Sequence, residues 1–110
     1  MKLKALALAT GAAALAVSVA GTALAKVEGD TIILGSSISL TGKYATNGLH
    51  TQRGYDYAVK VINEAGGVKV GGKSYKLAVK YYDDESTPAR GAQLAERLIQ
   101  QDGVEYMLGP

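Results

Sequence analysis

The order of two hydrophobic patterns limits this chain to an α/β fold. Thr31–Ser37 is an apolar, β-branched run without clean alternation, which is typical of a strand covered on both faces. It is followed by a helical period over residues 48–65, an alternating strand over 75–82, a second helical period over 88–101, and a short apolar run over 104–108. This order predicts a doubly wound parallel sheet of βαβαβ type with right-handed crossovers.

We expect the Thr31 strand to lie between the strand at 75–82 and the strand at 104–108, which is the order 2-1-3. The winding direction then reverses between the first and third strands, and small ligands bind in the crevice beside such a switch point. The loop Ile38–Gly48 leaves the carboxyl end of the central strand. The sequence therefore predicts that this loop forms part of a small-molecule pocket.

Three side chains of this loop are candidates for ligand contacts: Thr41, Tyr44 and Asn47. Hydroxyl and amide groups can hydrogen-bond a zwitterion or an amide, and a tyrosine ring can cover the apolar part of such a ligand. The alternative is an ordinary polar loop in which Asn47 is the N-cap of the helix that follows.

The spacing of small and apolar residues predicts which faces of the two helices are buried. The first face consists of Gly54, Ala58, Val61, Ile62 and Ala65, and the second of Ala92, Ala95, Leu98 and Ile99, with Leu94 beside them. Three dipeptides predict boundaries: Gly66-Gly67 ends the first helix, Gly71-Gly72 turns a hairpin, and Thr87-Pro88 begins the second helix.

A run of carboxylates, Asp83-Asp84-Glu85, follows the second strand. Paired carboxylates at a strand end can hold Mg²⁺ or accept a phosphoryl group. We favour a structural interpretation in which they stabilise the positive end of the next helix dipole.

Composition excludes several other kinds of site. The chain has no cysteine, so it has no disulfide, thiolate zinc site or cysteine nucleophile, and a single histidine, His50, has no second ligand or triad partners. Neither the P-loop nor the dinucleotide glycine motif is present. We therefore expect no catalytic set, no metal and no cofactor. Lys2 and Lys4 account for the net charge of +2, so the remainder is neutral and nucleic acid is not an expected partner.

Residues 1–25 have the pattern of a secretory signal peptide. Lys2 and Lys4 form a positive start, an alanine-rich apolar region follows, and Ala23-Leu24-Ala25 provides the small residues of a cleavage site. Cleavage after Ala25 would leave Lys26–Pro110 as the mature portion, which should face an oxidising compartment outside the cytoplasm. The alternative, a membrane anchor, is less well supported because the segment has few bulky apolar residues.

Four spaced segments carry a resemblance to a known family: Ile38–Gly42, Gly54–Val68, Tyr82–Pro88 and Ala95–Pro110. Together they resemble the periplasmic branched-chain amino-acid/amide-binding family, the substrate-binding components of ATP-binding-cassette (ABC) importers. The resemblance implies a two-lobed, non-enzymatic and monomeric protein of the type I periplasmic-binding fold, which closes on a small solute and delivers it to a membrane permease. It also implies that residues 26–110 are the incomplete N-terminal part of the first lobe.

Two positions depart from the family pattern. Relatives often have an aromatic residue near Asn47, and amino-acid-binding members have a disulfide-forming cysteine where this chain has Ser86. The ligand therefore stays open among branched-chain amino acids, short amides, urea and small aromatic acids. Two other functions also stay open: a sensory domain of a receptor with the same fold, and a doubly wound enzyme or phosphoacceptor that uses Asp83 and Asp84.

Overall fold

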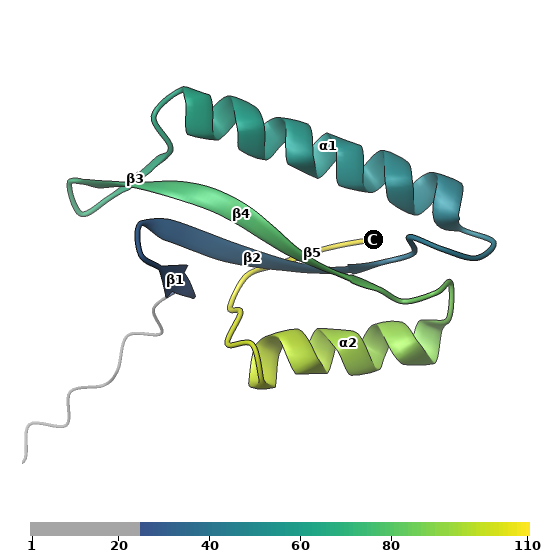
Figure 1. Cartoon of the computed structure of the whole chain (residues 1–110). Coiled ribbons are helices and arrows are strands. Elements are labelled where there is room, and N and C mark those ends of the chain that lie inside the picture. Colours follow the sequence, from purple (N-terminus) through teal and green to yellow (C-terminus); the bar gives the residue numbers. More distant parts are fainter. Residues whose placement is uncertain (1–24) are drawn as a thin grey trace, which may run out of the picture.

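A computed structural model describes residues 25–110 as one sheet with a helix on each face (Figure 1). The central strand is β2, Thr31–Ile38, which pairs in parallel with β4, Lys73–Asp83, along its whole length. The opposite edge of β2 pairs in parallel with β5, Met107–Leu108, at Gly35 and Ser36. The predicted α/β class and the 2-1-3 order of the parallel strands are thus confirmed.

An additional short strand, β1, was not predicted. It consists of Val27–Glu28 and pairs antiparallel with the start of β2, on the edge that β5 also uses. Gly29, at φ +64°, allows the tight turn between β1 and β2. A two-residue strand is too short to produce a hydrophobic period, so the pattern gave no signal for it.

The predicted hairpin is confirmed. Strand β3, Val68–Val70, pairs antiparallel with the start of β4, and Gly71 and Gly72 between them have φ values of +57° and +80°. These are the left-handed conformations that a tight two-residue turn requires. The end of the first helix at Gly66-Gly67 is also confirmed, since both glycines have positive φ.

Helix α1, Ala45–Glu64, covers the sheet face that carries the even-numbered residues of β2. The side of the helix that packs on the sheet is not the side that the sequence predicted. The predicted set, Gly54, Ala58, Val61, Ile62 and Ala65, is exposed, and the sheet is faced instead by Gly48, Thr51, Gln52, Tyr55, Val59 and Asn63. Hydrogen bonds set this rotation. The side chain of Asn63 accepts from the backbone N–H of Leu77 (2.8 Å) and donates to its carbonyl (2.9 Å), and the Tyr81 hydroxyl donates to Asp56 (2.7 Å).

Helix α2, Pro88–Gln100, covers the other face of the sheet, and its predicted start is confirmed with Thr87 at the N-cap and Pro88 at the first position. Its buried face is only partly as predicted. Gly91, Leu94, Ala95 and Leu98 lie inward, whereas Ala92 and Ile99 are exposed.

The core on the α2 side lies against Gly35. Leu98 and Val104 are fully buried, and a Cβ at Gly35 would lie 2.8 Å from the Val104 side chain. Close packing here therefore requires a residue without a side chain in the middle of β2. The predicted third strand is correspondingly shorter than expected, because Val104 packs into the core from a loop and only Met107–Leu108 pairs with β2.

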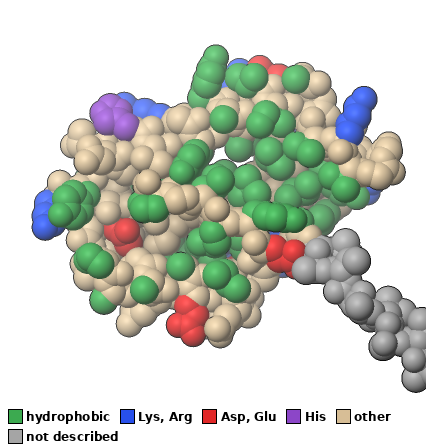
Figure 2. Space-filling view, turned by 180° about the vertical axis from the view of Figure 1, so that it is seen from behind, with side chains coloured by type: hydrophobic (Ala, Val, Ile, Leu, Met, Phe, Trp, Pro, Cys, Tyr) green, Lys and Arg blue, Asp and Glu red, His purple; other side chains and the backbone are tan. Residues whose placement is uncertain are grey.

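Part of the sheet face on the α1 side is not covered by the helix. It forms an apolar hollow of about 800 Å³ beside the amino-terminal half of β2, and Figure 2 shows hydrophobic side chains gathered on this side of the molecule. Its lining includes Val27, Ile32, Leu34, Val68, Val70, Tyr75, Leu77 and Tyr106. The hollow lies at the opposite end of the strand from the loop that the sequence singled out.

Two glycines of α1 offer a matched test of the fold, because a methyl group should have opposite effects at them. A Cβ at Gly48 would overlap the carbonyl oxygen of Ser39, whereas a Cβ at Gly54 meets nothing within 4 Å. We expect Gly54→Ala to stabilise the protein by about 0.5–1 kcal/mol through helix propensity, and Gly48→Ala to destabilise it by about 1–3 kcal/mol through overpacking. Urea denaturation measures both, and a stabilised Gly48→Ala variant would contradict the described helix position.

Candidate functional site

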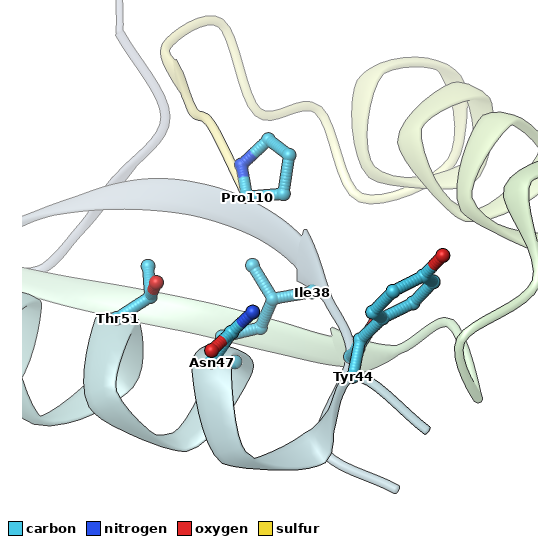
Figure 3. Close-up of a pocket in the computed structure, with 7 residues that line it drawn as sticks. Ile38, Tyr44, Asn47, Thr51 and Pro110 are labelled. Carbon is cyan, nitrogen blue, oxygen red and sulfur yellow. The ribbon is translucent and has the colours of Figure 1, made fainter. Parts of the chain in front are cut away.

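A pocket of about 320 Å³ opens at the carboxyl end of β2 (Figure 3). It is formed by the end of this strand, the first two turns of α1, and the segment that follows β5. Its lining residues are Ile38, Ser39, Tyr44, Asn47, Gly48, Thr51 and Pro110, and none of their side chains carries a formal charge. The pocket therefore lies where the reversal of winding predicted it, and it offers hydroxyl, amide and aromatic groups.

Tyr44 and Asn47, two of the three predicted residues, both line this pocket. Tyr44 is the N-cap residue of α1 and is 48% exposed, and Lys43 places its ammonium 4.6 Å from the ring centre. Asn47 and Thr51 project from the same side of α1 toward Pro110 in Figure 3. Thr51 lies one helical turn after Asn47, so helical periodicity could have identified it from the sequence.

The interpretation of Asn47 as an N-cap is wrong. Helix α1 begins at Ala45, and the side chain of its N-cap residue, Tyr44, makes no capping hydrogen bond. The turn starts earlier because Gly42 adopts φ +84°, and the N–H of Ala45 then donates to the Gly42 carbonyl (3.2 Å). Asn47 consequently lies within the first turn, on the side that faces the pocket.

Thr41, the third predicted residue, is not among the residues that line the pocket. Its hydroxyl donates to Oδ2 of Asp83 (2.7 Å), and its backbone N–H donates to Oδ1 of the same carboxylate (3.2 Å). Thr41 therefore connects the loop after β2 with the end of β4.

Asp83 is the centre of this connection. Its Oδ1 also accepts from the backbone N–H groups of Leu40 (2.9 Å) and Glu85 (2.9 Å). Partial burial raises the pKa of Asp83, but the hydrogen bonds from Thr41, Glu85 and Leu40 outweigh it, so the pKa lies below its ordinary value. The carboxylate is thus held in its ionised form by the two loops that it joins.

Asp84 makes a second connection between the same loops. Its Oδ1 accepts from the Ser39 hydroxyl (2.6 Å) and from the backbone N–H of Ser86 (2.8 Å). The expectation that these carboxylates stabilise the start of α2 stays a prediction: none of them lies within its first turn, but a Cβ at Gly91 would lie 3.5 Å from the Asp84 carboxylate, and Glu85 pairs with Arg90. They also fix the loop after β2.

The metal alternative finds no geometric support in residues 25–110, where no three His, Cys, Asp or Glu side chains come together as a metal site requires. Glu85 points away to Arg90, whose Nε lies 3.1 Å from its carboxylate. His50 is exposed on α1. The acidic run is therefore a structural junction.

Residues 31–110 match the Periplasmic binding protein family, and the chain belongs to this family. Among curated relatives, "Leu/Ile/Val-binding protein homolog 1" of Brucella abortus is 33% identical over 78 residues, which are 71% of this chain and 20% of that protein. The "Leucine-, isoleucine-, valine-, threonine-, and alanine-binding protein" of Pseudomonas aeruginosa is 31% identical over 94 residues, which are 86% of this chain and 24% of that protein.

Solved structures agree with this assignment. The branched-chain amino acid transporter substrate-binding protein LivJ of Streptococcus pneumoniae, in complex with isoleucine, is 34% identical with a TM-score of 0.64, over 73% of this chain and 22% of that one. A putative branched-chain amino acid ABC transporter protein of Silicibacter pomeroyi is 30% identical with a TM-score of 0.63, over 73% of this chain and 19% of that one. The fold is therefore that of part of a type I periplasmic binding protein.

The chain spans about a fifth of the length of the relatives that it matches. The expected signal peptide lies almost wholly outside the described residues, and among residues 25–110 no helix is both long and apolar enough to cross a bilayer.

The Asp83 junction predicts a specific dependence of stability on pH. Because the folded-state pKa lies below the ordinary value of 3.8, ionised Asp83 stabilises the fold above that value, and the contribution is lost as the pH falls through the folded-state pKa. We expect the urea midpoint of the wild type to fall below about pH 4, and the Asp83→Asn variant to be less stable at pH 7 but to lose less on acidification. Asp102, whose pKa is also lowered, leaves a residual slope. Parallel pH curves for the two proteins would contradict this role of Asp83.

Proposed function

We propose that this chain is the start of the first lobe of an exported solute-binding protein of an ABC importer. The protein would capture a small amino acid, amide or related organic solute in the periplasm and deliver it to a membrane permease. One observation carries the proposal: a pocket lined by uncharged side chains, Tyr44 and Asn47 among them, lies at the strand tips of a chain whose relatives are named for binding leucine, isoleucine and valine.

The chemistry of the pocket fits capture without reaction. Tyr44 offers an apolar ring with a hydroxyl, and Asn47 and Thr51 offer an amide and a hydroxyl on one side of α1. These groups can hydrogen-bond and cover a small solute, but none of them is placed as a nucleophile beside a general base. In this proposal a second lobe supplies the other wall, and hinge closure excludes water from the bound solute.

We assign the predicted site residues two kinds of role. Tyr44 and Asn47 would contact the solute directly, and Thr51, which the sequence analysis did not select, would contact it beside Asn47. Thr41 would act through its hydrogen bonds to Asp83, which hold the loop in place. The same bonds weaken the enzyme or phosphoacceptor alternative, because the Asp83 carboxylate already accepts four hydrogen bonds from the protein.

The decisive experiment is a ligand screen on the full-length protein that carries this chain, expressed without residues 1–25. A solute present at about 100 times its dissociation constant adds roughly 2.7 kcal/mol to the free energy of unfolding, which raises the melting temperature by a measurable amount. We expect stabilisation by one class within a panel of amino acids, amides and organic acids. No response to the panel, with stabilisation by nucleotides instead, would contradict the proposal.

A pair of tyrosines on α1 tests the site itself. Tyr44 lines the pocket, whereas Tyr57 is 69% exposed and is not among the lining residues. For the solute found in the screen, we expect Tyr44→Ala to weaken binding by about tenfold and Tyr57→Ala to leave it unchanged, because only the first ring would cover the ligand. Isothermal titration calorimetry measures both. Equal affinity in the two variants would exclude Tyr44 from the binding site.

A further inference from the structure

The turn that carries Ser86 is conformationally unusual. Glu85 and Ser86 have φ values of +53° and +61°, and they are the non-glycine residues with positive φ in the described part of the chain. Such conformations cost free energy and persist only where surrounding contacts fix them. Here the backbone N–H groups of Glu85 and Ser86 donate to the carboxylates of Asp83 (2.9 Å) and Asp84 (2.8 Å).

This turn directs the Ser86 hydroxyl into the loop after β2. The hydroxyl donates to the carbonyl oxygen of Thr41 (2.7 Å) and accepts from the backbone N–H of Tyr44 (3.0 Å). One side chain thus binds both ends of the segment 41–44. The N–H of Tyr44 stands at the N-cap of α1, where the helix supplies it no partner.

The loop wraps closely around this hydroxyl. A Cβ at Gly42 would lie 2.7 Å from the Ser86 Oγ and 3.0 Å from the Glu85 carbonyl oxygen, so only glycine fits at this position. Beyond Tyr44, Gly48 packs against the carbonyl of Ser39. The pocket residue Tyr44 therefore lies between two close contacts, one at Gly42 and one at Gly48, and Ser86 provides a hydrogen bond at the first.

We propose that Ser86 is a positioning residue for the solute pocket: its hydroxyl fixes the backbone at Tyr44 and thereby orients the first turn of α1, which carries Asn47. This inference rests on the proposed function, because it takes the pocket to be the site that binds a solute. The hydroxyl contributes through geometry, because Ser86 is not among the residues that line the pocket.

Amide hydrogen exchange tests the positioning without any ligand. In Ser86→Ala and Ser86→Gly, we expect the Tyr44 amide to exchange about five- to tenfold faster, the effect of losing one neutral hydrogen bond, while the amides of β2 keep their protection. Glycine adopts the left-handed conformation at residue 86 without strain. If Ser86 only stabilised its own turn, the Tyr44 amide would therefore exchange at the wild-type rate in Ser86→Gly. Ser74→Ala, at an exposed position of β4, is the matched control. Unchanged exchange at Tyr44 in both variants would overturn the proposal.

Affinity provides the second readout, in the full-length protein with L-leucine and L-isoleucine as probes. If the wild type binds either probe, we expect both Ser86 variants to bind it about fivefold more weakly at a temperature where each is folded, with Ser74→Ala unchanged. Wild-type affinity in both variants would overturn the proposal even if exchange at Tyr44 changes. If the wild type binds neither probe, its solute is another member of the proposed class, and the exchange experiment alone decides whether Ser86 positions the loop.

Discussion

The carboxylate of Asp83 determines how the two longest parallel strands of this sheet end. Strands β2 and β4 run side by side to Ile38 and Asp83, and beyond them the chain leaves in two separate loops. The Asp83 carboxylate accepts hydrogen bonds from backbone N–H groups of both loops and a further one from the Thr41 hydroxyl. Without it these backbone groups would lose their partners at the sheet edge where the pocket forms. The arrangement of Tyr44 and Asn47, which follow β2 in the chain, thus depends on an acidic residue at the end of β4.

Much of this architecture could be predicted because it is encoded by local patterns. The unbroken apolar run of β2, the glycine pairs after α1 and within the hairpin, and Pro88 at the start of α2 each specify a local structure, and each is found where it was expected. The faces of α1 could not be read in the same way. Its sheet-facing positions include Thr51, Gln52, Tyr55 and Asn63, which give little hydrophobic signal. Two of them make hydrogen bonds that no pattern reveals: Asn63 with Leu77, and the Tyr55 hydroxyl with the carbonyl of Gly109.

The pocket, too, could be predicted only in part: its position could, but the contacts that shape its loop could not. The position of the loop followed from strand order, which hydrophobic pattern and handedness determine. Two contacts that shape the loop depended on partners more than 40 residues away in sequence: the Thr41 hydroxyl with Asp83, and the backbone N–H of Tyr44 with the Ser86 hydroxyl. Such pairings have no period or spacing. The strand order explains why a pocket lies here, and the hydrogen bonds explain why this loop has this shape.

The pairing of Asn63 with Leu77 has a consequence for self-association. Strand β3 covers the outer edge of β4 only as far as Tyr75, so the N–H and carbonyl of Leu77 are the next groups to which another extended chain could add. The amide of Asn63 occupies both of them. An exposed sheet edge is a template for aggregation, and proteins protect such edges in specific ways. In this protein a helix protects the edge of β4 at Leu77 with one side chain, which imitates a further residue of β3.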